Sequence, residues 1–293
     1  MLDCDETRAI AAQILAQMRH REAVPLLIAL SRDANPTIRA TAIDALSGFH
    51  APQIAPILLG ALTDHASAVR LRAVRGVGFC LNDLPNTDWL PYLEPLLSDL
   101  DLQVSRQAAL TLGRLGTVGA VQALAAVLRS PHTPDQLAID VIRALCWMER
   151  TEAMVELGQI WSTTSLSQPL RQAICQNFGQ VETAAIRVQV TGLLIGWLES
   201  DADVARSFAL QQAIITALGL LGDRQSVDLL IQQLAVKEPR LQLHLIASLK
   251  QIDATLAHER LVQVAASSST ESSTTSSTDQ LLQRAAMLAL QEW

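Results

Sequence analysis

The sequence is poor in the residues on which several common protein classes depend. Aromatic residues make up only 3% of its 293 positions, and β-sheet proteins normally use more of them. Its four cysteines include no CxxC pair and have no regular spacing, so the sequence indicates neither a disulfide framework nor a zinc-binding module. No uninterrupted run of about 18 apolar residues occurs, so no membrane-spanning helix is predicted.

Lysine is scarce as well. Of the 22 basic residues only Lys237 and Lys250 are lysines, and the other 20 are arginines. The 29 acidic residues give a net charge of −7, which disfavours nucleic-acid binding because that usually requires a basic surface. The arginine excess has two interpretations that stay open: guanidinium groups placed to bind carboxylates or phosphates, or a compositional bias of the genome.

The first residues carry no export signal. Residues 1–6 read MLDCDE, whereas a secretory signal is basic and then strongly apolar. Cys146 and Cys175 each follow a position that we assign to the core, which is typical of small buried packing residues. Unpaired thiols are typical of a reducing compartment, so we expect a cytoplasmic protein.

The sequence does contain a repeated motif. Ile38-Arg39 followed by Leu46 recurs as Val69-Arg70 followed by Val77. A period of about 20–50 residues is typical of stacked repeats, because one repeat cannot bury its apolar face alone. The successive apolar anchors lie 31 to 41 residues apart, and they are Leu15, Leu46, Val77, Leu112, Leu145, Phe178, Leu218, Leu249 and Leu290.

Each repeat is predicted to form two helices, here named A and B, from apolar residues at helical spacing. We therefore predict an all-α, right-handed superhelical α-solenoid of about eight antiparallel helix pairs, spanning residues 1–293 as a single domain. A lone first helix B is predicted over 6–18. The pairs that follow it are 22–31 with 36–49, 53–62 with 68–81, 88–98 with 102–115, 120–129 with 135–148, 152–162 with 168–179, 183–199 with 204–221, 225–236 with 240–252, and 255–265 with 279–293.

Two irregularities interrupt this pattern. Residues 266–278 are rich in Ser and Thr and are predicted to form a flexible loop within the last repeat, with Thr278 or Asp279 capping the final helix. This loop is interpreted as an inserted linker or as a phosphorylated segment. The first repeat lacks a helix A. Because a terminal repeat needs a polar cap over its apolar face, we expect either a cap formed by this chain or a heterodimeric partner there.

The spacing of Asp33 from Arg39, and of Asp64 from Arg70, resembles that of HEAT repeats, and the short period is similar to the HEAT-like repeats of phycobilisome lyases. The resemblance implies that these four residues belong to a hydrogen-bonded ladder between adjacent repeats. Later repeats depart from the pattern. Ser105 replaces the ladder arginine, with Arg106 displaced by one position, Arg171 restores it, and Gln211, Gln242 and Gln283 occupy the slot in the last repeats.

The sequence contains none of the common catalytic motifs for which we searched. There is no GxSxG, no HExxH and no GxxxxGK phosphate loop. Gly76-Val77-Gly78 lies inside a predicted helix B, so we interpret it as helix packing. The six histidines are spread over separate repeats, and because zinc needs three or four convergent ligands, no metal site is predicted. The acid pairs Asp99/Asp101 and Asp201/Asp203 precede helices B and are interpreted as helix caps.

HEAT arrays line their concave face with helices B, so the resemblance implies a partner-binding groove on the outward positions of these helices. Its middle is rich in arginine and amide side chains, which suit carboxylates and phosphates, whereas its C-terminal third is small and apolar. A second interpretation is that the arginines are ordinary solvated surface. The predicted groove residues are Arg72, Arg75, Gln107, Asp140, Arg143, Gln176, Ala213 and Ala247.

Three tryptophans, Trp147, Trp161 and Trp197, lie near the ends of predicted helices in the central repeats. An exposed tryptophan is a typical interface anchor, and a buried one is part of the core. Both interpretations stay open for each of the three.

We therefore predict a non-enzymatic protein-binding scaffold or assembly chaperone, whose groove holds an acidic or helical segment of a partner protein. The alternative is a phycobilin lyase-like protein that binds a tetrapyrrole and presents it to a phycobiliprotein, since arginines also suit bilin propionates. The first prediction needs no cofactor, and the second needs a bilin. Neither involves nucleic acid or a membrane span.

Overall fold

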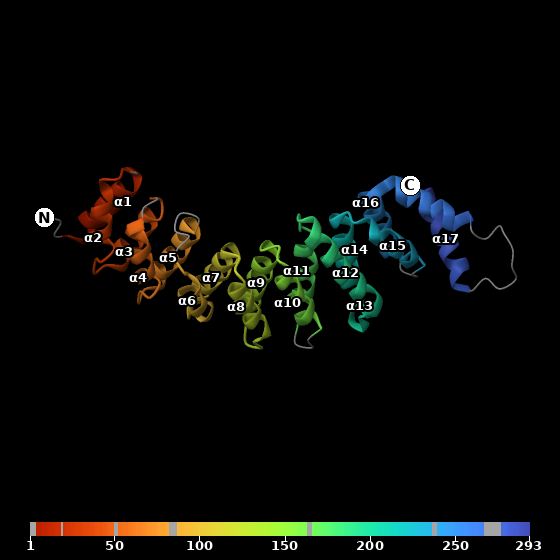
Figure 1. Ribbon diagram of the computed structural model, residues 1–293, viewed down its shortest axis with the longest axis horizontal. Coiled ribbons are helices and arrows are strands. Elements are labelled where there is room, and N and C mark those ends of the chain that lie inside the picture. The colour runs from red at the N-terminus through yellow and green to blue at the C-terminus, as the bar shows by residue number, and fades with distance from the viewer. Residues whose placement is uncertain are drawn as a thin grey trace. The chain divides into compact units, whose positions relative to one another are not determined.

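The helical repeats are present in the computed structural model, which describes residues 4–18, 20–49, 52–81, 87–162, 166–235, 239–266 and 277–293. Every regular element within these ranges is an α-helix or a short 3₁₀ helix (Figure 1). The chain divides into two compact units, the N-terminal unit Met1–Met148 and the C-terminal unit Glu149–Trp293. The predicted all-α solenoid is therefore confirmed, whereas its continuity as a single domain stays a prediction.

In the N-terminal unit helices A and B alternate as predicted. Pro36 occupies the first turn of a helix B, and Asn35 caps that helix by accepting a hydrogen bond from the backbone N–H of Thr37 at 2.9 Å. The elements are α1 (Asp5–Met18), α2 (Ala23–Leu30), α3 (Pro36–Leu46), η1 (Pro52–Ile54), α4 (Ala55–Ala61), α5 (Ser67–Cys80), α6 (Leu90–Leu93), η2 (Glu94–Ser98), α7 (Leu102–Leu115), α8 (Val118–Arg129) and α9 (Asp135–Trp147).

The C-terminal unit follows the same plan, except that one predicted helix is broken in two. The predicted helix 204–221 is broken, because Asp201 caps one short helix and the hydroxyl of Ser207 caps the next. The predicted helices 240–252 and 255–265 are both present within α16, because the backbone of Asp253 between them is extended (φ −163°, ψ 98°) and its carboxylate accepts hydrogen bonds from the N–H groups of Thr255 and Leu256. The elements are α10 (Thr151–Trp161), α11 (Gln168–Phe178), α12 (Ala184–Ser200), α13 (Ala202–Arg206), α14 (Phe208–Leu221), η3 (Arg224–Ser226), α15 (Val227–Gln233), α16 (Pro239–Ala266) and α17 (Ser277–Gln291).

Most of the predicted Ser/Thr-rich loop, residues 267–276, lies outside the described residues. Its described edges are helical, since Ala266 ends α16 and Ser277 begins α17. Thr278 therefore lies inside the final helix rather than before it. No helix in the described ranges is long and apolar enough to cross a membrane.

Helices B pack directly on one another and carry the core. In the N-terminal unit α1, α3, α5, α7 and α9 contact in sequence, and in the C-terminal unit α11, α14, α16 and α17 do the same (Figure 1). The anchors Leu46, Leu112, Phe178, Leu218 and Leu249 are fully buried. The apolar repeat in the sequence thus becomes a continuous apolar layer within each unit.

Small residues allow neighbouring helices B to approach closely. A Cβ atom on Gly113 of α7 would lie 2.8 Å from the Cβ atom of Ala144 on α9. The corresponding glycine of the C-terminal unit, Gly219 on α14, faces Ser248 on α16 equally closely, at 2.8 Å from the hydroxyl oxygen. Glycine is needed at both positions because any larger residue would push the two helices apart.

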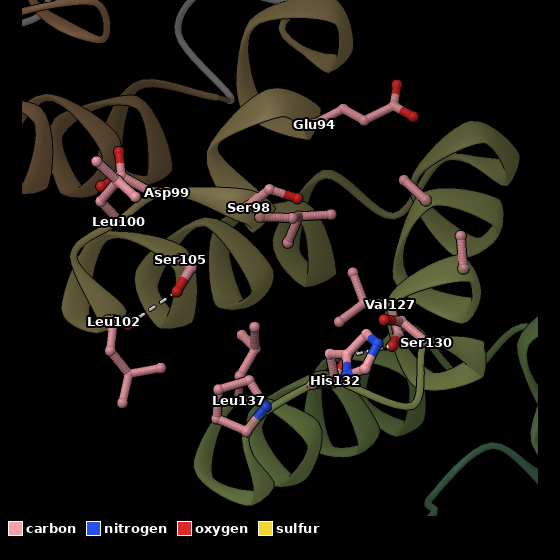
Figure 2. Close-up of a pocket in the computed structure, with 15 residues that line it drawn as sticks. Glu94, Ser98, Asp99, Leu100, Leu102, Ser105, Val127, Ser130, His132 and Leu137 are labelled. Atoms are coloured by element: carbon pink, nitrogen blue, oxygen red, sulfur yellow. Dashed lines mark hydrogen bonds between the residues drawn. The ribbon is translucent and has the colours of Figure 1, made fainter.

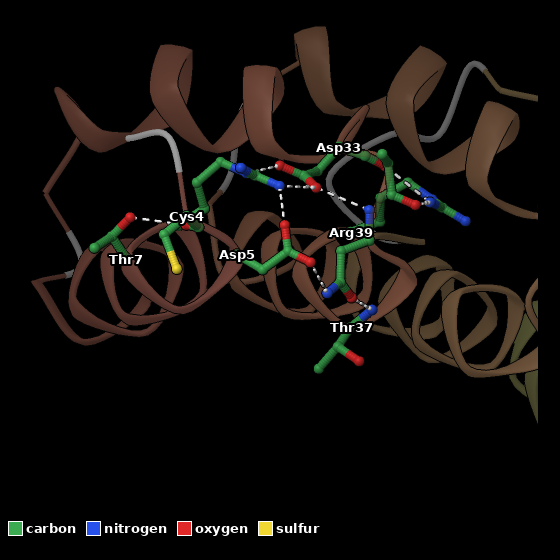
Figure 3. Close-up of polar contacts among 9 residues, drawn as sticks. Cys4, Asp5, Thr7, Asp33, Thr37 and Arg39 are labelled. Carbon is green, nitrogen blue, oxygen red and sulfur yellow. Dashed lines mark hydrogen bonds and ion pairs between the residues drawn. The ribbon is translucent and has the colours of Figure 1, made fainter. Parts of the chain in front are cut away.

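The predicted arginine–aspartate ladder is present. Arg39 donates two hydrogen bonds to the carboxylate of Asp64, both 2.8 Å long, and Arg70 donates two of 2.7 Å to Asp99. Upstream, Arg8 donates from Nε to Asp33 at 2.7 Å, in the contacts shown in Figure 3. Asp99, interpreted from the sequence as a cap, is therefore a ladder acid.

The ladder also fixes the charge state of its acids. The hydrogen bonds from Arg8 and Arg39 lower the pKa values of Asp33 and Asp64, respectively, below their ordinary value. Burial alone would raise the pKa of Asp99, but the hydrogen bonds from Arg70 and from the backbone of Asp101 outweigh it, and the pKa is lowered. These carboxylates are ionised and paired near neutral pH.

Candidate binding surface

The predicted groove residues lie on helices B of both units. Arg72 and Arg75 are on α5, Gln107 is on α7, and Asp140 and Arg143 are on α9, all within the N-terminal unit. In the C-terminal unit the three groove residues are Gln176 on α11, Ala213 on α14 and Ala247 on α16. Whether these two sets form one groove stays a prediction, so each is described within its own unit.

Three of the N-terminal groove residues, Arg75, Gln107 and Asp140, line one cavity. It lies between α5, α7 and α9, has a volume of about 350 Å³, and is here named the arginine cavity. Its lining residues are Leu71, Arg75, Gln103, Arg106, Gln107, Leu110 and Asp140. Two guanidinium groups, two amides and two leucines thus surround a single carboxylate.

The prediction that Asp140 faces outward is wrong. Asp140 is only 2% exposed. Its carboxylate accepts hydrogen bonds from Arg106 Nε at 2.5 Å and from Arg143 Nη1 at 3.1 Å. Asp140 forms the floor of the cavity, because a buried carboxylate is tolerated only where charged donors satisfy it. Two guanidinium groups share one negative charge, which leaves a positive surplus there.

Arg72 and Arg75 differ, although both are on α5. Arg72 is paired with Asp44 of α3 at 3.0 Å, in an exposed ion pair, so its charge is largely compensated. Arg75 is exposed, and no carboxylate in the described part of the chain pairs with it. Arg75 is therefore the residue of this surface best placed to meet an external anion.

Arg106 lines the arginine cavity but is absent from the predicted groove residues. It lies one position after the ladder slot at Ser105, and one residue turns a helix by about 100°. That rotation takes Arg106 away from the loops and onto the same surface as Asp140. The displaced arginine in the repeat alignment was the available signal.

The corresponding surface of the C-terminal unit is rich in amides. A cavity of about 480 Å³ between α11 and α14, here named the glutamine cavity, includes the predicted groove residues Gln176 and Ala213. Ala247 is exposed on the next helix B, α16. The lining residues are Gln172, Gln176, Gln180, Ala209, Gln212, Ala213, Thr216, Ala217 and Leu220. None of them carries a formal charge, unlike the arginine cavity.

The three tryptophans differ in exposure, and Trp197 is half-buried. Trp147 is 54% exposed at the end of α9, whereas Trp161 is only 1% exposed. Trp161 stacks on Trp197 with ring centroids 3.8 Å apart and donates from Nε1 to Asp201 at 2.7 Å. Trp161 therefore belongs to the core of the C-terminal unit.

The described residues contain no group of three or more His, Cys, Asp or Glu side chains that could hold a metal ion. Cys80, Cys146 and Cys175 are buried, as predicted for the last two. Burial raises the pKa of the Cys175 thiol, which keeps it protonated and unreactive. Gly76 lies inside α5, where an added Cβ would meet Ser47, so the Gly76-Val77-Gly78 segment is helix packing.

Comparison with known proteins agrees with this architecture. The sequence profile of HEAT repeats matches residues 2–78 and 55–146. The chain is a HEAT-repeat protein. No curated protein matches the sequence.

Several solved structures are similar to this HEAT-repeat chain at low identity. An engineered protein is 18% identical and covers 98% of this chain and 85% of its own, with a TM-score of 0.46. Human deoxyhypusine hydroxylase in complex with glycerol is 17% identical, with coverages of 85% and 91% and a TM-score of 0.39. The complex of CpcE and CpcF of phycocyanin lyase from Nostoc sp. is 19% identical, with coverages of 92% and 94% and a TM-score of 0.44. None of these values supports a transfer of function.

Proposed function

We propose that this HEAT-repeat protein is a non-enzymatic binding scaffold or assembly chaperone of the cytoplasm, and that it holds an acidic, partly apolar segment of a partner protein on its helices B. The observation that carries the proposal is the arginine cavity. Arg75 and Arg106 line this cavity, and Arg106 and Arg143 both donate to the single carboxylate of Asp140.

The charges of this cavity favour an anionic partner group. Asp140 offsets one of the three guanidinium charges, so the cavity and its rim keep a surplus of two. Arg75 is exposed and unpaired among the described residues, and guanidinium groups bind carboxylates through two parallel hydrogen bonds. Leu71 and Leu110 line the same cavity, so an acidic side chain followed by an apolar one matches its chemistry.

The glutamine cavity supports a polypeptide as the partner. Each glutamine amide offers both hydrogen-bond donors and an acceptor, which complements the C=O and N–H groups of an extended or helical segment. The small side chains of Ala209 and Ala213 leave room for a backbone to approach. Within its own unit this surface is suited to a polypeptide more than to a single anion.

The decisive experiment is affinity capture of the partner from the native host, followed by binding measurements with the captured protein. Arg75→Glu is expected to weaken binding about tenfold or more, because it replaces an attraction by a repulsion worth at least about 1.4 kcal/mol. Arg21→Glu is the matched control, since Arg21 is exposed in the loop between α1 and α2 and the change in net charge is the same.

The outcomes are distinct. Equal weakening by Arg75→Glu and Arg21→Glu would show that only net charge matters, and unchanged binding by both would exclude the arginine cavity as the contact. The double variant Arg75→Glu/Arg143→Glu is expected to abolish binding while leaving the helical circular dichroism signal intact.

The lyase-like alternative makes a different prediction for the same eluate. The guanidinium surplus of the arginine cavity would also suit the propionates of a tetrapyrrole. A visible absorption band, or a co-eluting phycobiliprotein, would favour a bilin-carrying protein. A stoichiometric, colourless protein partner would favour the scaffold.

A further inference from the structure

Two ladder arginines of the N-terminal unit, Arg39 and Arg70, each make two kinds of contact. Arg70 binds the carboxylate of Asp99 in the next repeat, and its Nη1 also donates to the backbone carbonyls of Asp64 and His65 in its own repeat, at 2.8 and 3.1 Å. Arg39 repeats this pattern with the carbonyls of Asp33 and Ala34, at 2.8 and 2.9 Å. The guanidinium group thus fills the space between two successive loops.

In the next repeat this guanidinium is missing. Ser105 occupies the arginine slot, and its hydroxyl donates to the carbonyl of Leu102 at 3.1 Å, within its own helix. The carbonyls of Asp99 and Leu100 correspond to those that Arg70 binds one repeat earlier, and no described donor contacts either of them. His132 stands in the place of the next ladder aspartate.

A cavity of about 490 Å³ lies at this position, here named the gap cavity. Figure 2 shows Ser98 and Ser105 on one side of it and Ser130 and His132 on the other. It is lined by Glu94, Leu97, Ser98, Asp99, Leu100, Leu102, Ser105, Ala123, Ala126, Val127, Ser130, His132, Thr133, Pro134 and Leu137. Neither arginine nor lysine is among them.

The chemistry of the gap cavity is the reverse of that of the arginine cavity. Its lining residues include Asp99 and Leu100, whose backbone carbonyls have no described donor, Ser98 and Ser130, which carry hydroxyl groups, and Glu94, which is exposed and carries a carboxylate. The carboxylate of Asp99 is already neutralised by Arg70, so Glu94 leaves a net negative charge. Leu97, Val127 and Leu137 provide the apolar surface along which an arginine side chain packs its methylene groups.

We propose that the gap cavity binds an arginine side chain of a partner polypeptide, whose guanidinium group takes the place of the missing ladder arginine. The guanidinium donates to the carbonyls of Asp99 and Leu100, as Arg70 does to those of the preceding loop, and Glu94 compensates its charge. This site is separate from the arginine cavity, and it stands whether or not the proposed function is correct.

The test is a titration of the full chain with N-acetyl-L-arginine methylamide, followed by the backbone amide signals in nuclear magnetic resonance. We expect saturable shifts in the amide signals of residues 98–102 and of Ser130, His132 and Thr133. N-acetyl-L-citrulline methylamide has nearly the same shape without the charge and is expected to bind about tenfold more weakly.

The variant Ser105→Arg is expected to abolish these shifts without lowering the melting temperature, because its own guanidinium reaches the same two carbonyls. Gln211→Arg is the matched control, since Gln211 occupies the same slot in the C-terminal unit and already donates to the carbonyl of Ala205 at 3.0 Å. It is expected to leave the titration unchanged. Unsaturable shifts, equal binding of the citrulline compound, or undiminished binding by a folded Ser105→Arg variant would each overturn the proposal.

Discussion

The two units of this protein stack the same kind of helix pair but join successive repeats by different polar contacts. In the N-terminal unit, arginines reach the aspartate of the next repeat at Asp33, Asp64 and Asp99. Among the described residues of the C-terminal unit, an arginine in the ladder slot makes this contact at Arg171, to Asp203 at 3.1 Å, and Arg224, outside the slot, pairs with Asp253 at 2.8 Å. Seven of the nine apolar anchors are fully buried, and only the terminal ones, Leu15 and Leu290, are half-buried. The repeat therefore depends on its apolar layer, whereas the polar link is replaceable.

A ladder arginine makes hydrogen bonds both within its own repeat and to the next repeat, and a glutamine of the C-terminal unit shows which of the two kinds is retained. Gln211 donates to the carbonyl of Ala205, six residues earlier, as Arg70 does to that of Asp64. A glutamine side chain is too short to reach the next repeat as well, and it has no charge with which to pair an aspartate there. At Gln211 the bond within the repeat is thus kept, and no bond to the next repeat is seen among the described residues. The stack of Trp161 on Trp197 adds a contact that has no counterpart in the described part of the N-terminal unit.

The largest expected effect concerns this aromatic stack. Trp161→Ala is expected to destabilise the C-terminal unit by about 4 kcal/mol, because it leaves a large cavity and removes one of the donors to Asp201. Trp147→Ala, at an exposed position of the N-terminal unit, is expected to change stability by less than about 0.5 kcal/mol. Hydrogen exchange of helix amides in each unit measures both values, and similar losses for the two variants would contradict the assignment of Trp161 to the core.

The second prediction converts a ladder position into its counterpart in the other unit. Arg70→Gln is expected to cost about 3 kcal/mol, because the side chain of Asp99 is only 6% exposed and would lose its charged partner. Gln211→Ala is expected to cost about 1 kcal/mol, the usual value of one hydrogen bond. Urea denaturation followed by circular dichroism measures both, and equal costs would mean that the link between repeats contributes nothing beyond the link within them.

The smallest expected effect is on the pH dependence of stability. The pKa of Asp64 is lower in the folded chain than in the unfolded one, since Arg39 stabilises its ionised form. This contribution is present above the unfolded pKa of about 3.9 and is lost as the pH falls through the folded value. The stability difference between the natural protein and Asp64→Asn should therefore shrink below about pH 4. A difference that stays constant in acid would show that the ladder does not contribute through the charge of Asp64.

Sequence periodicity predicted the helices well where local signals agree. The segment 102–115 was predicted with the bounds that α7 has, since Asp101 caps its beginning and Gly116, at φ 62°, ends it. The break between α13 and α14 was missed, because the apolar spacing continues through it while the caps at Asp201 and Ser207 start two helices. Capping and periodicity compete there, and only the folded chain shows which one prevails.

The sequence by itself determined the repeat, the helical pairs, the buried anchors and the identity of the first ladder residues, because these follow from local periodicity and from spacing within one repeat. The tertiary structure alone decided which polar groups meet across repeats: Asp99 with Arg70, and Asp140 with Arg106 and Arg143. It also showed that Ser105 opens a cavity. Contacts of this kind depend on the distance and rotation between neighbouring helices, which packing of the whole unit sets and no single repeat encodes.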